Sequence, residues 1–415
     1  MPPSIRRVLN DLPESLDETY ERILREIQKP NQRHAHRLLQ CLVAAVRPLS
    51  LYELSEVLIF DYDAVDAEGI PEGPELNPDW CLPRKDKEEA IMTVCSNLFT
   101  IVKDEHRRLV VQFSHFSVKE FLTSKRLAEP IRDVSRYHIR LEDAHTFLVR
   151  VCLGALFRLR FNGSLVDDSP LDLYAVDNWF IHAQFGDVSS CVKDAIIRLF
   201  DKDKPHFHTW LKLADEPYCE DAPLFFVASF GFCDAAEHLI AQHPEQINAK
   251  YSWGQTPLYS AVAKGYIDMV SLLLKNGADV EARVMGQTPL HQAVMNGKLE
   301  VTRRLLDHGA DINSRTERNV TPLCAAVARG HVELARMLLE RGAAMDIRPR
   351  MDPGPTLLTV AVESRNIQMV RLLLEYGEDV NEPDGLKMTP SQRASKSQQQ
   401  DIVELLLEYG AEPVQ

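Results

Sequence analysis

Polar and apolar positions in the C-terminal half of the chain recur with a period near 33 residues. The tripeptide Thr-Pro-Leu begins at Thr256, Thr288 and Thr321, which are 32 and 33 residues apart, and weaker copies begin at Thr356 and Thr389. Each copy leads into a leucine-rich segment that a glycine follows: Gly277, Gly309, Gly342, Gly377 and Gly410. A helix start and a helix stop that repeat at this period predict stacked two-helix units.

The unit that begins at Thr288 shows why these residue types form two helices. Threonine can cap a helix, and Pro289 already has the helical φ and no N–H to leave unbonded. Val301, Leu305 and Leu306 follow at helical spacing and predict the apolar stripe of a second helix. Gly309 is expected to follow that helix in the left-handed conformation. We expect about six units, with a degenerate first and last unit as in other capped arrays.

The N-terminal part has helical spacing first and strand-like runs later. Apolar residues on one face predict helices around 16–27 and 38–46, and Ser50 with Glu53 forms a capping box that opens a third helix. Two apolar runs, 99–102 and 109–113, flank a polar segment and predict a β-hairpin before a further helix around Val118. Several helices followed by a hairpin are the order of a winged helix.

Two less regular segments separate these parts. Asp61 to Asp79 contains seven acidic residues and no basic residue, together with glycines and prolines, and predicts a loop or linker. From Leu141 to about Asp215 the spacing is helical again, and we expect a connector that packs onto the first repeat, with Trp179 and Trp210 as core anchors. The predicted fold is mainly α: a winged-helix-like domain with a small β-hairpin (1–135), a helical connector (136–217) and a repeat solenoid (218–415).

Composition narrows the class of protein. The net charge of -14 over 415 residues argues against a nucleic-acid binder, which normally carries a basic patch. The eight cysteines are scattered without a C-x-x-C pair and predict reduced, mostly buried thiols. The N-terminus has no apolar signal core, and no apolar run approaches the roughly 20 residues of a membrane span. We therefore expect a cytoplasmic location and no membrane partner.

The repeats resemble the ankyrin repeat family, most closely at Thr288-Pro-Leu-His-Gln-Ala293 with Gly297 and at Asn276-Gly-Ala-Asp-Val280. The resemblance implies stacked antiparallel helix pairs with projecting hairpin fingers, and a concave face that binds a protein. It implies no catalysis. It also implies that His291 braces neighbouring repeats by hydrogen bonds.

Read onto this chain, the ankyrin pattern places partner-binding residues in two kinds of position. Residues just before each Thr-Pro lie on the fingers, and residues just before the glycine in the middle of each repeat face the groove. The predicted partner-binding residues are Trp253, Lys264, Met285, Met295, Asn296, Arg318, Arg329 and Glu363. Trp, Met and Arg are residue types that anchor interfaces. The alternative for Trp253 is an ordinary packing role against its neighbouring finger.

Three motifs in the front part resemble the segment that follows the nucleotidase core in fungal NACHT-ankyrin proteins, which are NLR-like receptors. They are Leu12-Pro-Glu-Ser-Leu-Asp-Glu-Thr-Tyr-Glu-Arg-Ile-Leu24, Arg47-Pro-Leu-Ser-Leu-Tyr-Glu-Leu54 and Phe113-Ser-His-Phe-Ser-Val-Lys-Glu-Phe-Leu122. In that family the segment forms a helical and winged-helix region between an ATPase switch and a repeat sensor. The phosphate loop G-x-x-x-x-G-K-[ST] does not occur in this sequence, so we expect no ATP hydrolysis by it.

The other motifs that could indicate a metal site or a catalytic site are weak evidence for either. His34 with His36, and His206 with His208, have spacing that a metal could use, but no cysteine or carboxylate cluster accompanies them, and surface or capping roles are expected. His115 lies beside Ser114 and Ser117 without a G-x-S-x-G elbow, and we expect a packing residue. We therefore predict no catalytic residue, no cofactor and no metal site.

These observations predict a protein-binding role, either as the regulatory and sensing half of a NACHT-ankyrin receptor or as a stand-alone ankyrin adaptor. Two alternatives stay open. The chain could be the C-terminal fragment of an ATP-dependent signalling NTPase, or a winged-helix regulator that binds DNA. The second is less favoured, because the helix that would enter a groove carries Glu53 and Glu56, and the phosphate attraction that dominates DNA affinity is missing.

Overall fold

The computed structural model describes residues 16–59, 91–92, 97–129, 133–158, 170–214, 222–345 and 354–413. The chain divides into two compact units, Met1–Glu220 and Asp221–Gln415, and each is described by itself. The acidic segment 61–79 lies outside the described residues, as do Cys81, Cys95 and Cys219.

The front of the first unit is a winged helix with a small antiparallel sheet. Its helices are α2 (Leu16–Glu26), η1 (Lys29–Asn31), α3 (Gln32–Ala44), α4 (Leu51–Ile59) and α6 (Phe116–Leu122). The sheet has the strand order β1 (Leu49–Ser50), β3 (Leu109–Phe113), β2 (Phe99–Lys103). The predicted hairpin is confirmed, with Phe99 opposite Phe113 and Lys103 opposite Leu109. Strand β1 was not expected, because two residues are too few to show an alternation.

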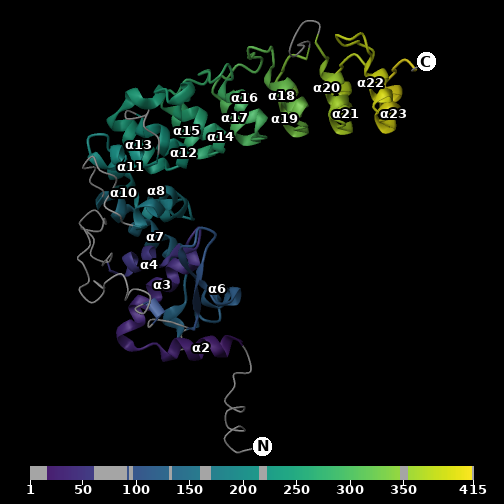
Figure 1. Cartoon of the computed structure of the whole chain (residues 1–415). Helices are drawn as coiled ribbons and strands as arrows, with labels where there is room; N and C mark the ends of the chain where they lie inside the picture. Colours follow the sequence, from purple (N-terminus) through teal and green to yellow (C-terminus); the bar gives the residue numbers. More distant parts are fainter. Residues whose placement is uncertain are drawn as a thin grey trace, which may run out of the picture. The chain divides into compact units, whose positions relative to one another are not determined.

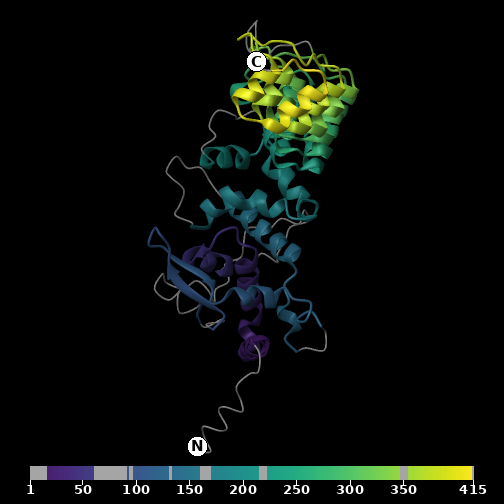
Figure 2. The same ribbon diagram turned by 90° about the vertical axis from the view of Figure 1, so that its right-hand side faces the viewer.

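The capping box before α4 is confirmed. The backbone N–H of Ser50 donates to Glu53 Oε2 (2.6 Å), and the backbone N–H of Glu53 donates to Ser50 Oγ (3.2 Å). Arg47 Nη2 also donates to Glu53 Oε1 (2.7 Å), so this buried carboxylate has a charged partner. Figure 2 shows the strands of the sheet, in blue, beside the purple helices of the same unit.

The segment after the sheet is helical, as expected. Its elements are η3 (Ser135–Tyr137), α7 (Leu141–Arg158), α8 (Pro170–Ala183), α9 (Val188–Cys191), α10 (Lys193–Leu199) and α11 (Pro205–Leu213). Trp179 and Trp210 are buried core residues, with ring centroids 6.5 Å apart at 83°, and Phe200 packs on both. Within the first unit, α7 packs on α3 and α8 packs on α4 (Figure 1). The segment predicted to be a connector therefore shares a core with the front helices.

A buried hydrogen-bond chain joins these helices to the front of the unit. The Tyr174 hydroxyl accepts the backbone N–H of Val46 (3.2 Å) and lies 2.8 Å from His182 Nε2. His182 Nδ1 in turn lies 2.9 Å from His145 Nδ1. A neutral His182 satisfies the whole chain, with Nε2 accepting from Tyr174 and Nδ1–H donating to His145. Burial, with His145 as a smaller cause, lowers the pKa of His182 to about 3.

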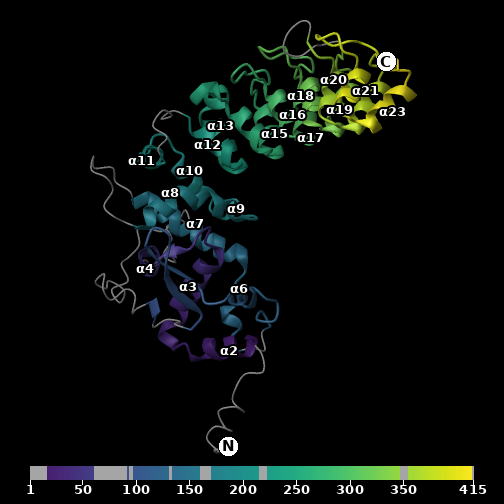
Figure 3. The same cartoon turned by 45° about the vertical axis from the view of Figure 1, so that its right-hand side comes forward.

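The second unit is an array of six helix pairs within the described residues. The pairs are α12 (Pro223–Phe230) with α13 (Cys233–Gln242), α14 (Pro257–Lys264) with α15 (Ile267–Lys275), α16 (Pro289–Met295) with α17 (Leu299–Asp307), α18 (Pro322–Arg329) with α19 (Val332–Glu340), α20 (Leu357–Glu363) with α21 (Ile367–Glu375), and α22 (Pro390–Lys396) with α23 (Gln400–Glu408). Short 3-10 turns η4 (Pro244–Asn248) and η5 (Ser252–Gly254) follow the first pair. Figure 3 shows the helix pairs stacked side by side, with the connecting loops projecting from one edge.

The predicted helix starts and stops are confirmed. Thr288 caps α16 by accepting the backbone N–H of His291, and Thr256, Thr321, Thr356 and Thr389 cap their helices in the same way. Gly309 follows α17 with φ of 86°, the left-handed conformation that glycine adopts without strain. The first helices of successive pairs pack on one another, and among the second helices α13 packs on α15, α15 on α17, α19 on α21 and α21 on α23.

The lowered pKa of His182 predicts acid sensitivity of the first unit. Between pH 6.5 and 3 the unfolded chain binds a proton at this residue that the folded chain excludes, so stability is present above pH 6.5 and falls below it. From pH 7 to pH 5 the loss from this residue is about 2 kcal/mol. Urea unfolding followed by tryptophan fluorescence at both pH values measures it.

The matched variant is His182→Gln, which keeps a donor and an acceptor but does not titrate. His36, His145 and His206 also have lowered pKa values, so they too reduce stability as the pH falls. The test therefore compares the pH dependence of the variant's stability with that of the unchanged chain, and some pH dependence remains in the variant. An unchanged pH dependence in His182→Gln would contradict the assignment.

A second prediction concerns the caps of the array. Thr321 is buried, and its Oγ1 accepts the backbone N–H of Cys324 (3.2 Å). Thr321→Val keeps the shape and leaves this N–H without its partner, so we expect a loss of about 1 to 2 kcal/mol in unfolding free energy. Ser271→Ala on the exposed face of α15 is the control and is expected to change stability by less than about 0.5 kcal/mol. Equal effects of the two changes in urea unfolding would contradict the capping role.

Candidate partner-binding surface

The fingers of the array are tight hairpins with left-handed residues at their tips. In the second finger, Val284 and Gln287 exchange backbone hydrogen bonds of 2.9 Å in both directions. Between them, Met285 has φ of 48° and Gly286 has φ of 76°. In the first finger, Trp253 and Gly254 have φ of 62° and 78°. Two successive positive φ values are the pattern of a type I′ turn, whose twist suits a two-residue hairpin.

Two large apolar side chains are held out at these tips. Trp253 is 76% exposed and Met285 is 71% exposed. A left-handed conformation costs a non-glycine residue roughly 1–2 kcal/mol, and exposure of an apolar side chain adds no compensating burial. The alternative that Trp253 packs on its neighbouring finger does not hold, because three quarters of the residue is open to solvent. Strain together with exposure at two neighbouring tips is typical of a surface used for recognition.

A cavity of about 440 Å³ lies between the second and third fingers and helices α16 and α18. Its lining combines apolar and charged side chains: Met285, Gln287, His291, Met295, Thr316, Glu317, Arg318, Val320, Ala325, Ala328 and Arg329. Four predicted partner-binding residues, Met285, Met295, Arg318 and Arg329, therefore lie together around it. The volume falls in the range of small-molecule pockets and also suits one or two side chains of a partner.

The cavity has a rigid base. His291 is buried, its Nδ1 lies 2.8 Å from Thr288 Oγ1, and its Nε2 lies 3.0 Å from the carbonyl oxygen of Val320 in the next finger. Burial lowers the pKa of His291, so the ring is neutral at pH 7 and Nε2–H can donate to that carbonyl. The predicted bracing role of His291 is thereby confirmed.

An arginine holds the second and third fingers together. Arg283 Nη1 donates to the carbonyl oxygen of Gly286 in its own finger (3.2 Å) and to that of Arg315 in the next (2.7 Å). The finger tips that flank the cavity are therefore positioned by hydrogen bonds as well as by the turn geometry.

The remaining predicted residues lie outside the lining of this cavity. Lys264 is exposed at the end of α14, and Trp253 stands on the preceding finger. Asn296 Nδ2 donates to the carbonyl oxygen of Ala263 (3.2 Å), which ties neighbouring repeats together. Glu363 Oε1 receives Arg393 Nη1 at 2.8 Å, so its carboxylate already has a charged partner in the array. Asn296 and Glu363 thus have structural contacts beside any contact with a partner.

Seven of the eleven lining residues were not among the predicted partner-binding residues, and Thr316, Glu317 and Ala325 are three of them. Thr316 and Glu317 belong to the third finger, and Ala325 lies on the first helix of the same unit. The repeat register could have placed the two finger residues on the surface. Which side of a finger faces a cavity depends on the stacking of its neighbours, so the sequence pattern alone could not select them.

Three histidines outside the array differ in burial from what the sequence predicted. His115 was expected to pack, but it is exposed and caps α6, with its Nδ1 2.6 Å from Ser117 Oγ. His36 and His206 were expected on the surface or at caps, yet each is partly buried, because α3 and α11 turn them toward neighbouring helices. Helical spacing did not reveal these neighbours.

Metal-binding clusters and membrane-spanning helices can both be assessed in the part of the chain that the structure describes. They include no group of three or more His, Cys, Asp or Glu side chains placed to hold a metal ion. In the same residues, every helix is too short or too polar to span a lipid bilayer. Among the described cysteines, Cys41, Cys152 and Cys324 are buried free thiols and Cys191 is exposed.

Comparison with protein families matches both units. The family described as "Ankyrin repeats (3 copies)" matches residues 180–284, 224–316, 282–349 and 345–415, which together cover more than half of the chain. The match begins at residue 180, inside the segment predicted to be a connector. The family described as "GPI inositol-deacylase, winged helix domain" matches residues 20–131.

Two curated proteins are similar over different lengths. "Azaphilone pigments biosynthesis cluster protein L" of Monascus ruber is 28% identical over 304 residues, 66% of this chain and 61% of that protein. "Alpha-latrocrustotoxin-Lt1a" of Latrodectus tredecimguttatus is 38% identical over 63 residues, 15% of this chain and 4% of that protein. The chain thus covers less than two thirds of the length of either relative.

Solved ankyrin domains are similar to part of the chain. The ankyrin repeat domain of Bcl-3 is 30% identical and has a TM-score of 0.44, covering 46% of this chain and 87% of that one. An ankyrin repeat domain (ABAYE2397) from Acinetobacter baumannii is 32% identical and has a TM-score of 0.43, covering 46% and 98%. The six stacked helix pairs and the family match over more than half of its length show that the chain belongs to the ankyrin repeat family, with a winged-helix domain in front of the repeats.

Proposed function

We propose that the chain is a protein-binding regulator whose ankyrin array holds a partner between the second and third fingers. The observation that carries this is the cavity with Met285, Met295, Arg318 and Arg329 around it, next to an exposed and strained Trp253. Ankyrin repeats are protein-interaction modules, and apolar anchors beside arginines are typical of interface hot spots. Lys264, Asn296 and Glu363 are included as peripheral contacts.

In this proposal the chain is the regulatory and sensing half of a NACHT-ankyrin receptor, or a stand-alone adaptor, and works in the cytoplasm. The winged-helix match and the relative from a Monascus ruber pigment cluster are compatible with a fungal protein of this kind. The proposal assigns no catalytic step to this chain. A C-terminal fragment of an ATP-dependent signalling NTPase is the alternative that shares this binding surface.

DNA binding by the winged helix is less well supported. Helix α4, which would enter a groove, packs against α8, and most of its described side chains are buried. Glu56 Oε2 accepts the backbone N–H of Leu171 (3.1 Å), and Glu53 pairs with Arg47. A helix that is covered in its own unit cannot also lie in a major groove.

The binding surface can be tested with a photo-crosslinking amino acid at position 285. We expect it to capture one specific protein, because Met285 stands exposed at the edge of the cavity. The same amino acid at position 299 on α17, outside the cavity lining, is the control. Capture of the same protein with equal yield from position 299 would count against the proposed surface.

The captured protein then allows an affinity measurement. In Trp253→Asn with Met285→Asn, asparagine tolerates the left-handed conformation, so the fingers keep their shape and lose only their apolar tips. We expect the dissociation constant to rise by about 100-fold or more, with an unchanged melting temperature. Leu299→Asn is the matched change of an exposed apolar residue and is expected to leave affinity within about threefold. Unchanged affinity in the double variant would refute the role of the tips.

The size of the endogenous protein separates the receptor from the adaptor. An immunoblot with an antibody against the repeats compares it with the 47.1 kDa of this chain. A band larger by about 100 to 200 residues or more would favour the receptor, because an ATPase core adds at least one domain. A band at the size of this chain would favour the stand-alone adaptor.

A further inference from the structure

Charge is divided unevenly between the two layers of helices in the ankyrin array. The first helices of the six described pairs carry four Lys or Arg residues and one carboxylate residue, Glu363. The second helices of the same pairs carry five Lys or Arg residues and eleven carboxylate residues. The first helices α16 and α18 line the cavity between the second and third fingers. This cavity therefore belongs to the cationic layer of a chain whose net charge is -14.

The second and third fingers add arginines that no carboxylate neutralises among the described residues. Arg283 Nη1 donates to two backbone carbonyl oxygens, and Arg315 Nη1 donates to Asn319 Oδ1 (3.2 Å), so their partners are uncharged. Arg318 and Arg329 line the cavity and are exposed. Their side chains have no ion pair or hydrogen bond with any residue that the structure describes. Both guanidinium groups are therefore available to a partner.

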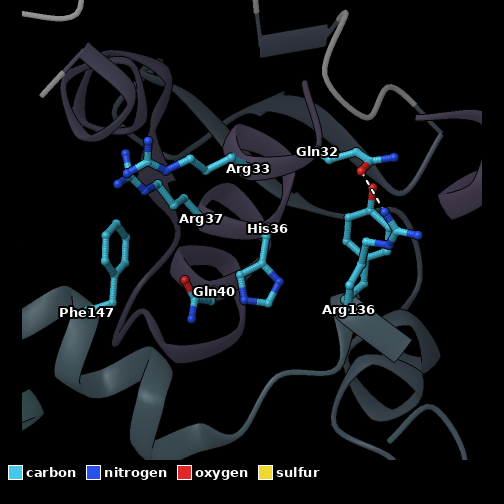
Figure 4. Close-up of a pocket in the computed structure, with 8 residues that line it drawn as sticks. Gln32, Arg33, His36, Arg37, Gln40, Arg136 and Phe147 are labelled. Atoms are coloured by element: carbon cyan, nitrogen blue, oxygen red, sulfur yellow. Dashed lines mark hydrogen bonds between the residues drawn. The ribbon is translucent and has the colours of Figure 1, made fainter. Parts of the chain in front are cut away.

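The cavity of the first unit shows a contrasting arrangement. It has a volume of about 430 Å³, and Arg33, Arg37 and Arg136 are among its lining residues. Arg33 and Arg37 have partners within the protein, and Arg136 Nη1 donates to Gln32 Oε1 (2.8 Å). Figure 4 shows the guanidinium groups of Arg33 and Arg37 at one side of this cavity and Arg136 at the other. These three charges do not converge on one ligand, so the cavity of the array is the better site for an acidic group.

One carboxylate, that of Glu317, also lines the cavity of the array. Its side chain lies against the second finger, where a Cβ on Gly286 would come 3.1 Å from Glu317 Cγ. The carboxylates at the bases of the fingers accept backbone hydrogen bonds instead: Glu281 that of Asp311 (2.8 Å), and Asp311 that of Asn313 (2.9 Å). Within the described residues, the lining thus has two arginines against one carboxylate.

The apolar part of the lining suits a large side chain. Met285, Met295 and Val320 contribute to it. Methionine side chains adapt their shape and make favourable contacts with aromatic rings. The planar fork of an arginine matches the two oxygens of a carboxylate. A large apolar side chain with acidic neighbours would therefore meet both parts of the lining at once.

We propose that the partner presents a short acidic segment in which a large apolar residue is flanked by Asp or Glu, an inference that rests on the binding surface proposed above. The apolar side chain enters the cavity beside Met285 and Met295, and the flanking carboxylates pair with Arg318 and Arg329. The acidic second helices repel such a segment, whereas the arginines attract it. The charge distribution of the array thus directs the segment to the face that binds it.

The test begins with random short peptides displayed on phage and selected against the full chain. Counter-selection against the double variant Trp253→Asn with Met285→Asn removes peptides that bind elsewhere. We expect the remaining peptides to carry a net negative charge and a large apolar residue beside Asp or Glu. The dissociation constant of a synthetic copy of the most enriched peptide is then measured by fluorescence anisotropy.

Three lining residues give effects of opposite sign. Arg318→Gln and Arg329→Gln should each weaken peptide binding by about threefold to fivefold, because each removes one exposed ion pair with the peptide. Glu317→Gln should strengthen binding by about twofold, because it removes a repelling charge without changing the shape of the side chain. Lys275→Gln at the exposed end of α15, outside the cavity lining, is the control and should stay within about 1.5-fold. All four positions are exposed, so the urea midpoint should not change.

Two results would overturn the acidic segment and leave the proposed binding surface intact. One is a set of peptides that need the apolar tips but carry no net negative charge. The other is a weakening by Glu317→Gln as large as that by the arginine variants. Failure to select any peptide that distinguishes the chain from the double variant would also overturn it. The crosslinking experiment at position 285 then decides the proposed function separately.

Discussion

The array depends on the burial of each helix pair against its neighbours, because a unit of about 33 residues has no core of its own. Leu290, Leu323 and Leu358 on the first helices are fully buried by this stacking. Side chains at the bases of the fingers add a second connection. Asn248 accepts the backbone N–H of Asp279, Glu281 that of Asp311, Asn313 that of Ala344 and Asn381 that of Glu412, each at 2.8 or 2.9 Å. At four of the five junctions between the described helix pairs, apolar contact is therefore combined with one of these hydrogen bonds.

The contacts between units explain how a repeat whose helices are buried by stacking can also present side chains to a partner. The helices and their threonine caps fix where each finger begins, and the hairpins place their central residues in solvent. Because the backbone needs no side chain at the tip, that position is free to carry Trp253 or Met285. The strain of a left-handed residue is small beside the stability of a stack, so the array tolerates it.

The first unit uses its winged helix as a packing platform. Helices α7 and α8 cover α3 and α4, and the chain Val46, Tyr174, His182 and His145 crosses that contact with hydrogen bonds. Helix α4, the element that would read DNA in a binding domain, is consequently occupied inside the protein. Packing within the first unit thus removes the covered face of α4 from the surface.

The sequence by itself determined the period, the caps, the hairpin and the class of fold, because these features depend on residues close together in the chain. Thr288-Pro289 starts a helix and Ser50 with Glu53 forms a capping box whatever surrounds them. It also indicated the finger positions of Met285 and Arg318, since the repeat register carries them. Only the tertiary structure decided that these two share a cavity with Met295 and Arg329. The same holds for α8 on α4, because contacts between residues about 100 positions apart follow from packing rather than from local pattern.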